Sequence, residues 1–224
     1  MEIAPSRRRL AVVVSLGLLT LFAVAMIVAR NIYTGESTYA NLIWNLTLAW
    51  VPLVLALFVY DAARRGAARW VIWAGGAAWL LFFPNAPYLM TDFQLLRDWQ
   101  AAPVWYDVVL LSTAAWAGLT LGFASLYLMH VVARRYVSAV GVWLGIAVVL
   151  GLSSFGIYLG RFERWNSWDV VSQPGPLLSD VAGRIAHPDP RTAGVTIVFT
   201  AFLALAYSVF YSVIRLGVTE RPPA

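Results

Sequence analysis

Gly156-Ile-Tyr-Leu-Gly-Arg-Phe-Glu-Arg-Trp-Asn-Ser-Trp-Asp169 takes the chain from an apolar run into a dense cluster of Arg, Glu, Trp, Asn and Asp. Arg and Trp are typical of the ends of membrane-spanning helices, where their polar groups reach water and their apolar parts stay in lipid. This stretch therefore predicts a helix that leaves a membrane, followed by a polar connection that carries whatever chemistry the chain performs.

The composition places the whole chain in the membrane class. Of its 224 residues, 61% are hydrophobic and only 12% are charged, whereas a soluble domain has about 25% charged residues. The chain has no Cys, which excludes disulfides and thiolate metal sites. The net charge of +5 does not indicate nucleic-acid binding, because the Arg residues sit in short loops between apolar runs.

Apolar runs of about 20 residues are long enough to cross the hydrocarbon core of a bilayer. The runs here predict an all-α, polytopic membrane bundle, a single domain over residues 1–224 with six transmembrane helices at about 10–29, 42–60, 67–84, 106–132, 137–160 and 193–214. Ala23-Val-Ala25 weakly resembles a signal-peptide cleavage site. The apolar run continues past it, which favours an uncleaved anchor.

The distribution of Arg predicts the orientation. With a cytoplasmic N-terminus, the inside segments hold ten Arg and three acidic residues, a charge of +7, and the outside segments hold six Arg and eight acidic residues, a charge of −2. Cytoplasmic loops are the more basic ones. We therefore expect both termini in the cytoplasm and the connections 84–106 and 160–192 outside.

The third run is short, because Trp70 to Phe83 is followed at once by Pro84-Asn-Ala-Pro87. Two prolines three residues apart disfavour a continuous helix. One interpretation is a broken helix that lines an outward-facing pocket, since irregular backbone at membrane depth must be buried or line a wet cavity. The other is a surface turn that ends the helix.

Two short interfacial helices are expected on the outer face. Thr91-Asp-Phe-Gln94 fits a capping box, with Thr91 as the N-cap of a helix over 91–99. Leu177, Val181 and Ile185 recur with helical spacing after Pro176, which predicts a second helix there.

Three pairs of glycines lie four residues apart: Gly118/Gly122, Gly141/Gly145 and Gly156/Gly160. Small residues at this spacing let helix backbones approach closely in lipid. We expect the fourth and fifth spans of one chain to pack against each other through them, in preference to dimerisation of two chains.

The candidate site combines the two outer connections. We expect the fifth helix to continue to about Trp165, which puts Tyr158, Arg161 and Trp165 on one face. The acceptors for the outer guanidiniums would come from Asp92, Asp107, Glu163 and Asp169. The predicted site residues are Asn85, Tyr88, Asp92, Tyr158, Arg161, Arg164, Trp165, Asn166, Trp168 and Asp169.

Two interpretations of this cluster stay open. Arg binds phosphate and carboxylate with a planar fork, so the cluster fits an anionic or polar ligand such as a lipid head group or a sugar. Alternatively, the Arg and Trp residues mark the bilayer boundary, with ion pairs that join one loop to another. No metal or cofactor is expected, because the two His lie on opposite predicted sides and no nucleotide or zinc motif is present.

Three segments carry a resemblance to a known family. Trp44-Asn45 with Ala49-Trp50, Phe83-Pro-Asn-Ala-Pro-Tyr-Leu-Met-Thr-Asp92 and the quoted stretch ending at Asp169 resemble the bacterial membrane family catalogued as domain of unknown function 1361. The resemblance covers roughly residues 40 to 215. It implies a multi-pass protein of the bacterial cytoplasmic (inner) membrane without an established activity.

Three functions are compatible with these features. The first is binding of a lipid head group or an envelope partner protein at the outer Arg/Asp/Trp/Asn cluster. The second is a membrane-embedded enzyme for a lipid-linked or phosphorylated substrate, with Asp92 or Asp169 as the base and Arg161 and Arg164 on phosphate. The third is a small-solute transporter, although no inverted repeat is visible in the sequence.

Overall fold

The computed structural model describes residues 5–187 and 189–219, and every element within these residues is a helix. This confirms the all-α prediction. In the described part of the chain, five helices are long and apolar enough to cross a membrane: α1 (Pro5–Thr34), α2 (Ala40–Arg64), α5 (Val104–Ala133), α6 (Ala139–Phe162) and α9 (Pro190–Thr219). They correspond to five of the six predicted spans.

The remaining predicted span, 67–84, corresponds to α3 (Arg69–Phe82), which has 14 residues. A helix of this length covers about 21 Å, less than the roughly 30 Å of a hydrocarbon core. The helix stops just before Pro84, and the four-residue α4 (Asn85–Tyr88) follows. A sixth span and the membrane depth of this break therefore stay predictions.

The capping box expected at Thr91 is wrong. The segment after α4 is a 3-10 helix, η1 (Leu89–Ala101), and Thr91 lies inside it. Its hydroxyl donates to the carbonyl of Tyr88 at 2.7 Å, and the N-cap position of η1 is Tyr88, not Thr91. The reason is that the chain turns helical at Asn85, directly after Pro84, so no free helix start is left at Thr91.

The chain divides into two compact units. One comprises Met1–Val54 and Asn85–Ala124, and the other comprises Leu55–Pro84 and Ser125–Ala224. Each unit is described by itself, and the single domain expected over 1–224 stays a prediction.

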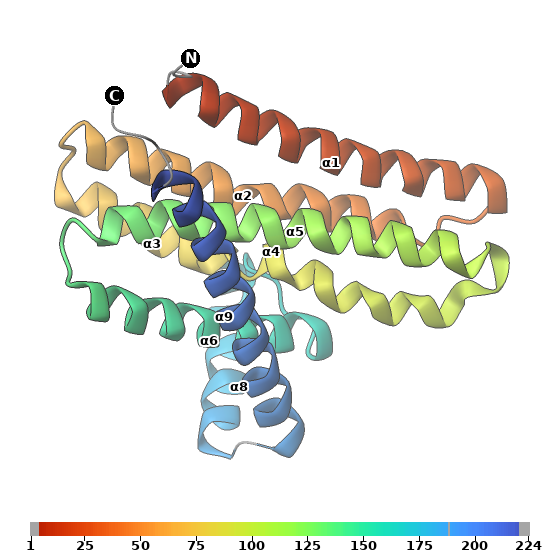
Figure 1. Ribbon diagram of the computed structural model, residues 1–224. Coiled ribbons are helices and arrows are strands. Elements are labelled where there is room, and N and C mark those ends of the chain that lie inside the picture. The colour runs from red at the N-terminus through yellow and green to blue at the C-terminus, as the bar shows by residue number, and fades with distance from the viewer. Residues whose placement is uncertain (1–4, 188, 220–224) are drawn as a thin grey trace. The chain divides into compact units, whose positions relative to one another are not determined.

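In the first unit, α1 and parts of α2 and α5 run side by side (Figure 1). Side-chain bonds fix their register: the indole of Trp50 donates to Thr20 at 3.2 Å, and the Tyr106 hydroxyl donates to the carbonyl of Met26 at 2.9 Å. The outer face of α1 exposes large apolar side chains such as Leu21, which is 65% exposed. Such a face suits lipid rather than water.

Gly118 in α5 has its closest neighbours in α4 and η1, and the packing of the fourth span against the fifth that the glycine spacing predicts stays a prediction. A Cβ at Gly118 would lie 2.3 Å from the carbonyl oxygen of Ala86 and 2.7 Å from a methyl of Leu89. The small residue therefore lets α5 approach the backbone of α4 and η1. A Cβ at Gly145, in contrast, would meet nothing within 4 Å.

In the second unit, α6 packs along α9. In the sequence, α7 (Asp169–Ser172) and α8 (Pro174–Ala186) connect α6 to α9. In space, α8 lies beside the first half of α9 (Figure 1). The helix predicted after Pro176 is thus confirmed and begins two residues earlier. Its interfacial position stays a prediction.

The start of α9 is held by Asp189. Its carboxylate accepts from the backbone N–H groups of Arg191 and Thr192 at 2.8 and 2.9 Å. A bond from the Thr192 hydroxyl and, after it, these backbone bonds lower the pKa of Asp189, because they stabilise the ionised carboxylate. This N-cap ends the connection at a defined residue.

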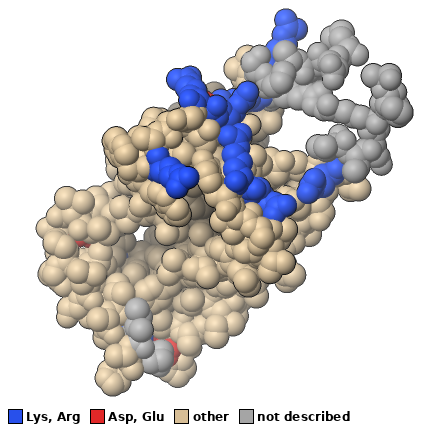
Figure 2. Space-filling view, turned by 90° about the vertical axis from the view of Figure 1, so that its left-hand side faces the viewer, with Lys and Arg blue, Asp and Glu red and all other residues tan. Residues whose placement is uncertain are grey.

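The surface carries few charges over wide areas. Figure 2 shows that most of the face it presents is uncharged, with patches of basic side chains and almost no acidic ones. On α9, for example, Ile197, Val198 and Leu205 are 65–70% exposed. Exposed apolar surface of this extent is that of a membrane protein.

Candidate functional site

The predicted site residues fall into both units. Asn85, Tyr88 and Asp92 belong to the first unit. The second unit holds the others: Tyr158, Arg161, Arg164, Trp165, Asn166, Trp168 and Asp169. The grouping of all ten into one site stays a prediction.

The helix predicted as the fifth span, α6, ends earlier than expected. We predicted that α6 continues to about Trp165, but it ends at Phe162, with Glu163 as its C-cap. Arg164 has a φ of 63°, and the backbone N–H of Trp165 folds back to the carbonyl of Leu159 at 3.2 Å. The left-handed backbone at Arg164 turns the chain, so Trp165 does not share a helical face with Tyr158 and Arg161.

The loop after Arg164 is built from its own hydrogen bonds. The carboxylate of Asp169, which is 7% exposed, accepts from the backbone N–H of Asn166 at 2.7 Å and from the Ser172 hydroxyl at 2.9 Å. Ser167 donates to the carbonyl of Leu81 in α3 at 3.1 Å. The backbone bond from Asn166 is the main reason that the pKa of Asp169 is lowered.

A second network joins the loop to α8 through Arg184. Its guanidinium contacts Glu163 at 2.7 Å, Asp180 at 3.0 Å and the Tyr158 hydroxyl at 3.1 Å. Asp180 also accepts from the indole of Trp165 at 2.9 Å. Glu163, Tyr158 and Trp165 therefore take part in bonds that hold α8 against the end of α6.

Arg164 differs from these neighbours. It is exposed, and it makes no hydrogen bond, ion pair or ring contact with the described residues. Asn166 is exposed beside it, and Trp168 is 41% exposed. Arg161 is partly buried and does have an interaction partner. The loop thus presents one unpaired guanidinium beside residues that are hydrogen-bonded within the protein.

In the first unit, Asp92 is buried and accepts from the side-chain amide of Asn45 at 3.4 Å. Asn85 and Tyr88 lie in α4, where both are partly buried and have partners. The Asn45 contact joins α2 to η1. It suits the interhelical bond that an intramembrane Asn usually makes.

One fully buried ion pair was not predicted from the sequence. Arg30 and Asp107, both 0% exposed in their side chains, form a bidentate pair with Nε–Oδ1 at 2.7 Å and NH2–Oδ2 at 3.2 Å. Tyr39 donates to the same carboxylate at 3.2 Å, and its ring lies 4.2 Å from the guanidinium carbon. Asp107 was expected as an acceptor for outer arginines; its partner is Arg30. The available signal was an ionisable residue at one end of each of two apolar runs.

A second missed cluster surrounds His130 in the other unit. His130 Nδ1 lies 3.0 Å from the Tyr207 hydroxyl, and its ring stacks on Tyr211 with centroids 4.9 Å apart. Trp143 completes the group, with its ring nearly perpendicular to that of His130. The cluster joins α5, α6 and α9. Within the described residues, no three His, Asp or Glu side chains are grouped to hold a metal ion.

Comparison with known proteins identifies the family of the chain. A family model described as "Protein of unknown function (DUF1361)" matches residues 44–206. No curated protein and no solved structure matches the chain. The matched region contains α3 to α8 completely, and with them all ten predicted site residues.

Proposed function

We propose for this chain, which belongs to the DUF1361 family of proteins of unknown function, a role as a multi-pass protein of the bacterial inner membrane that binds the phosphate of a lipid head group. The binding group is Arg164, in the loop between α6 and α7. The observation that carries the proposal is the combination of a left-handed backbone and an exposed, unpaired guanidinium at this one residue.

The backbone at Arg164 is costly for an amino acid with a side chain. A helix commonly ends in a left-handed residue, but that residue is usually Gly. A non-Gly residue there costs about 1 kcal/mol. Among the described residues, Arg164 is the one non-Gly residue with positive φ. Strained positions of this kind occur at binding and catalytic sites, where the side chain is retained for its function.

The support beneath Arg164 is suited to binding. Asp169, Ser167 and Trp165 each make a hydrogen bond that fixes the loop, so little conformational entropy is lost when a ligand binds. The free guanidinium offers a planar fork for two phosphate oxygens. Trp168 lies four residues further on, and Trp is a common residue at the head-group level.

The charge distribution in the second unit supports an outward position for this loop. The α2–α3 and α5–α6 turns lie together, because Arg135 donates to the carbonyl of Ala63 at 3.2 Å. They bring together Arg64, Arg65, Arg134 and Arg135. The 24 residues of α6 separate this basic end from Arg164 by about 36 Å. Because basic loops stay in the cytoplasm, we place both termini there and Arg164 outside.

The test uses Arg164→Gly, which removes the guanidinium and relieves the strained backbone. The full chain is purified, depleted of lipid and titrated with phosphatidylglycerol, and the bound lipid is counted by native mass spectrometry. We expect about a tenfold loss of affinity, as for one charge-assisted contact, together with unchanged or higher thermal stability. Arg164→Lys keeps the charge without the fork and should fall between the two.

The matched control is Arg65→Gly, which removes an exposed Arg from the basic end of the same unit. This variant should bind phosphatidylglycerol as tightly as wild type does. Equal retention of lipid by wild type and Arg164→Gly would exclude lipid binding at Arg164 and leave an envelope protein as the ligand of this loop.

A further inference from the structure

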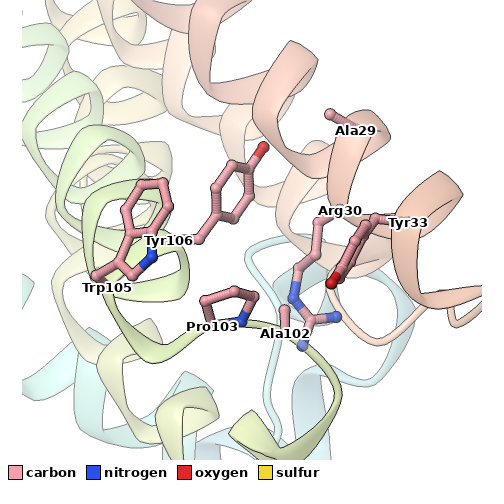
Figure 3. A pocket seen from close by; sticks show the side chains of 7 residues that line it. All are labelled: Ala29, Arg30, Tyr33, Ala102, Pro103, Trp105 and Tyr106. Atoms are coloured by element: carbon pink, nitrogen blue, oxygen red, sulfur yellow. The ribbon is translucent and has the colours of Figure 1, made fainter.

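A pocket in the first unit lies next to the buried ion pair. It has a volume of about 390 Å³ and is formed by the end of α1 and the start of α5 with the residues before it. Its lining residues are Ala29, Arg30, Tyr33, Ala102, Pro103, Trp105 and Tyr106 (Figure 3). A volume of this size falls within the range of small-molecule sites.

Apart from Arg30 and the hydroxyls of Tyr33 and Tyr106, the side chains that line the pocket are mostly apolar. Tyr33, Trp105 and Tyr106 contribute aromatic rings, and Ala29, Ala102 and Pro103 contribute small apolar groups. Tyr33 is 74% exposed and Trp105 is 67% exposed. Both rings stand at the edge of the pocket.

Arg30 has a hydrogen-bond donor that the protein does not use. Asp107 takes the Nε and NH2 groups of the guanidinium, and the ring of Tyr39 lies over its face. The NH1 group is buried and has no acceptor among the described residues. A buried donor without an acceptor costs roughly 1–3 kcal/mol, so an oxygen that reached NH1 would remove a real penalty.

The charges of Arg30 and Asp107 determine whether the ligand oxygen that binds NH1 is charged or neutral. The carboxylate of Asp107 already compensates Arg30 at 2.7 Å. An anionic ligand would place a second negative charge beside Asp107, and a pure hydrocarbon would leave NH1 unpaired. An uncharged carbonyl oxygen satisfies NH1 without adding charge.

We infer that this pocket binds an uncharged, carbonyl-bearing amphiphile, with the carbonyl oxygen on NH1 of Arg30 and the apolar body against Tyr33, Trp105 and Tyr106. Two sources supply this chemistry within a membrane: the ester group of a glycerolipid and the ring of a quinone. The site is separate from Arg164, because it lies in the other unit and requires no charge on the ligand.

The test fills the pocket without touching the ion pair. Ala29 is exposed and lines the pocket, so Ala29→Trp occupies the space of the ligand. Ala25, one turn earlier, is equally exposed and does not line the pocket, so Ala25→Trp is the matched control. The full chain in detergent is titrated with a diacylglycerol, the matching dialkyl ether and a decylquinone, with native mass spectrometry as the readout.

We expect wild type and Ala25→Trp to bind a carbonyl probe about ten times more tightly than the ether, the value of one hydrogen bond, and Ala29→Trp to lose this binding. Preference for the diacylglycerol assigns the oxygen to a lipid ester, and preference for the quinone assigns it to the quinone. Trp105→Ala, at an exposed position, should also weaken binding. It serves as the test variant if Ala29→Trp does not fold. Equal affinity for the ether, or binding unaffected by both variants, would overturn the inference.

Discussion

At the level of single residues, the structure separates side chains that hold the fold from those that are available to a ligand. Asp169 uses both carboxylate oxygens on its own loop, and Asp107 is consumed by Arg30 and Tyr39. Arg164, by contrast, has an exposed side chain without a partner among the described residues.

Removal of one partner of the Arg30–Asp107 pair should strongly destabilise the protein. Asp107→Asn leaves the Arg30 charge buried without compensation, and we expect a loss of about 3–5 kcal/mol in the free energy of unfolding. The double variant Arg30→Met/Asp107→Leu should cost clearly less, since no charge stays buried. Reversible unfolding in mixed micelles measures both. A cost below about 1 kcal/mol for Asp107→Asn would argue against the pair.

The lowered pKa of Asp169 predicts a pH dependence. The ionised carboxylate contributes fully to stability above about pH 5. This contribution is lost as the pH falls through 3.8, the ordinary pKa of Asp, and then through the lower pKa of Asp169 in the folded protein. The melting temperature of Asp169→Asn should therefore lie below that of wild type at neutral pH and approach it near pH 3. A difference that stays constant over this range would contradict the assignment.

At the level of elements, the contact of α5 with α4 depends on the absence of a side chain at Gly118. Gly118→Ala forces a Cβ to within 2.3 Å of the Ala86 carbonyl, and overpacking of this kind costs about 1–3 kcal/mol. Gly145→Ala is the control, because nothing lies within 4 Å of its Cβ. It should be neutral or slightly stabilising, because Ala favours a helix over Gly. Equal melting temperatures for the two variants would be evidence against the α4–α5 contact.

The elements also show how far local sequence signals extend. The lengths of the apolar runs predicted five of the helices, because burial in lipid imposes a length on each segment. The end of α6 was placed three residues too late, since helical spacing cannot reveal a left-handed Arg164. The Arg30–Asp107 pair joins residues 77 positions apart, and no local spacing encodes such a contact.

At the level of the whole molecule, the orientation is the prediction on which an outer ligand depends. The chain has no Cys, so single-cysteine variants have a clean background. Asn166→Cys and Arg65→Cys both replace exposed residues. In intact cells, we expect a membrane-impermeant maleimide to label residue 166 and to label residue 65 only after permeabilisation. The opposite pattern would place Arg164 in the cytoplasm.

The most direct measurement is a cryo-electron microscopy map of the full chain in nanodiscs that contain phosphatidylglycerol. We predict a phosphate density within hydrogen-bond distance of the Arg164 guanidinium in wild type, and its loss from Arg164→Gly with the loop unchanged. An ordered loop whose Arg164 points into water, or a lipid density that is identical in both maps, would contradict lipid binding at this residue.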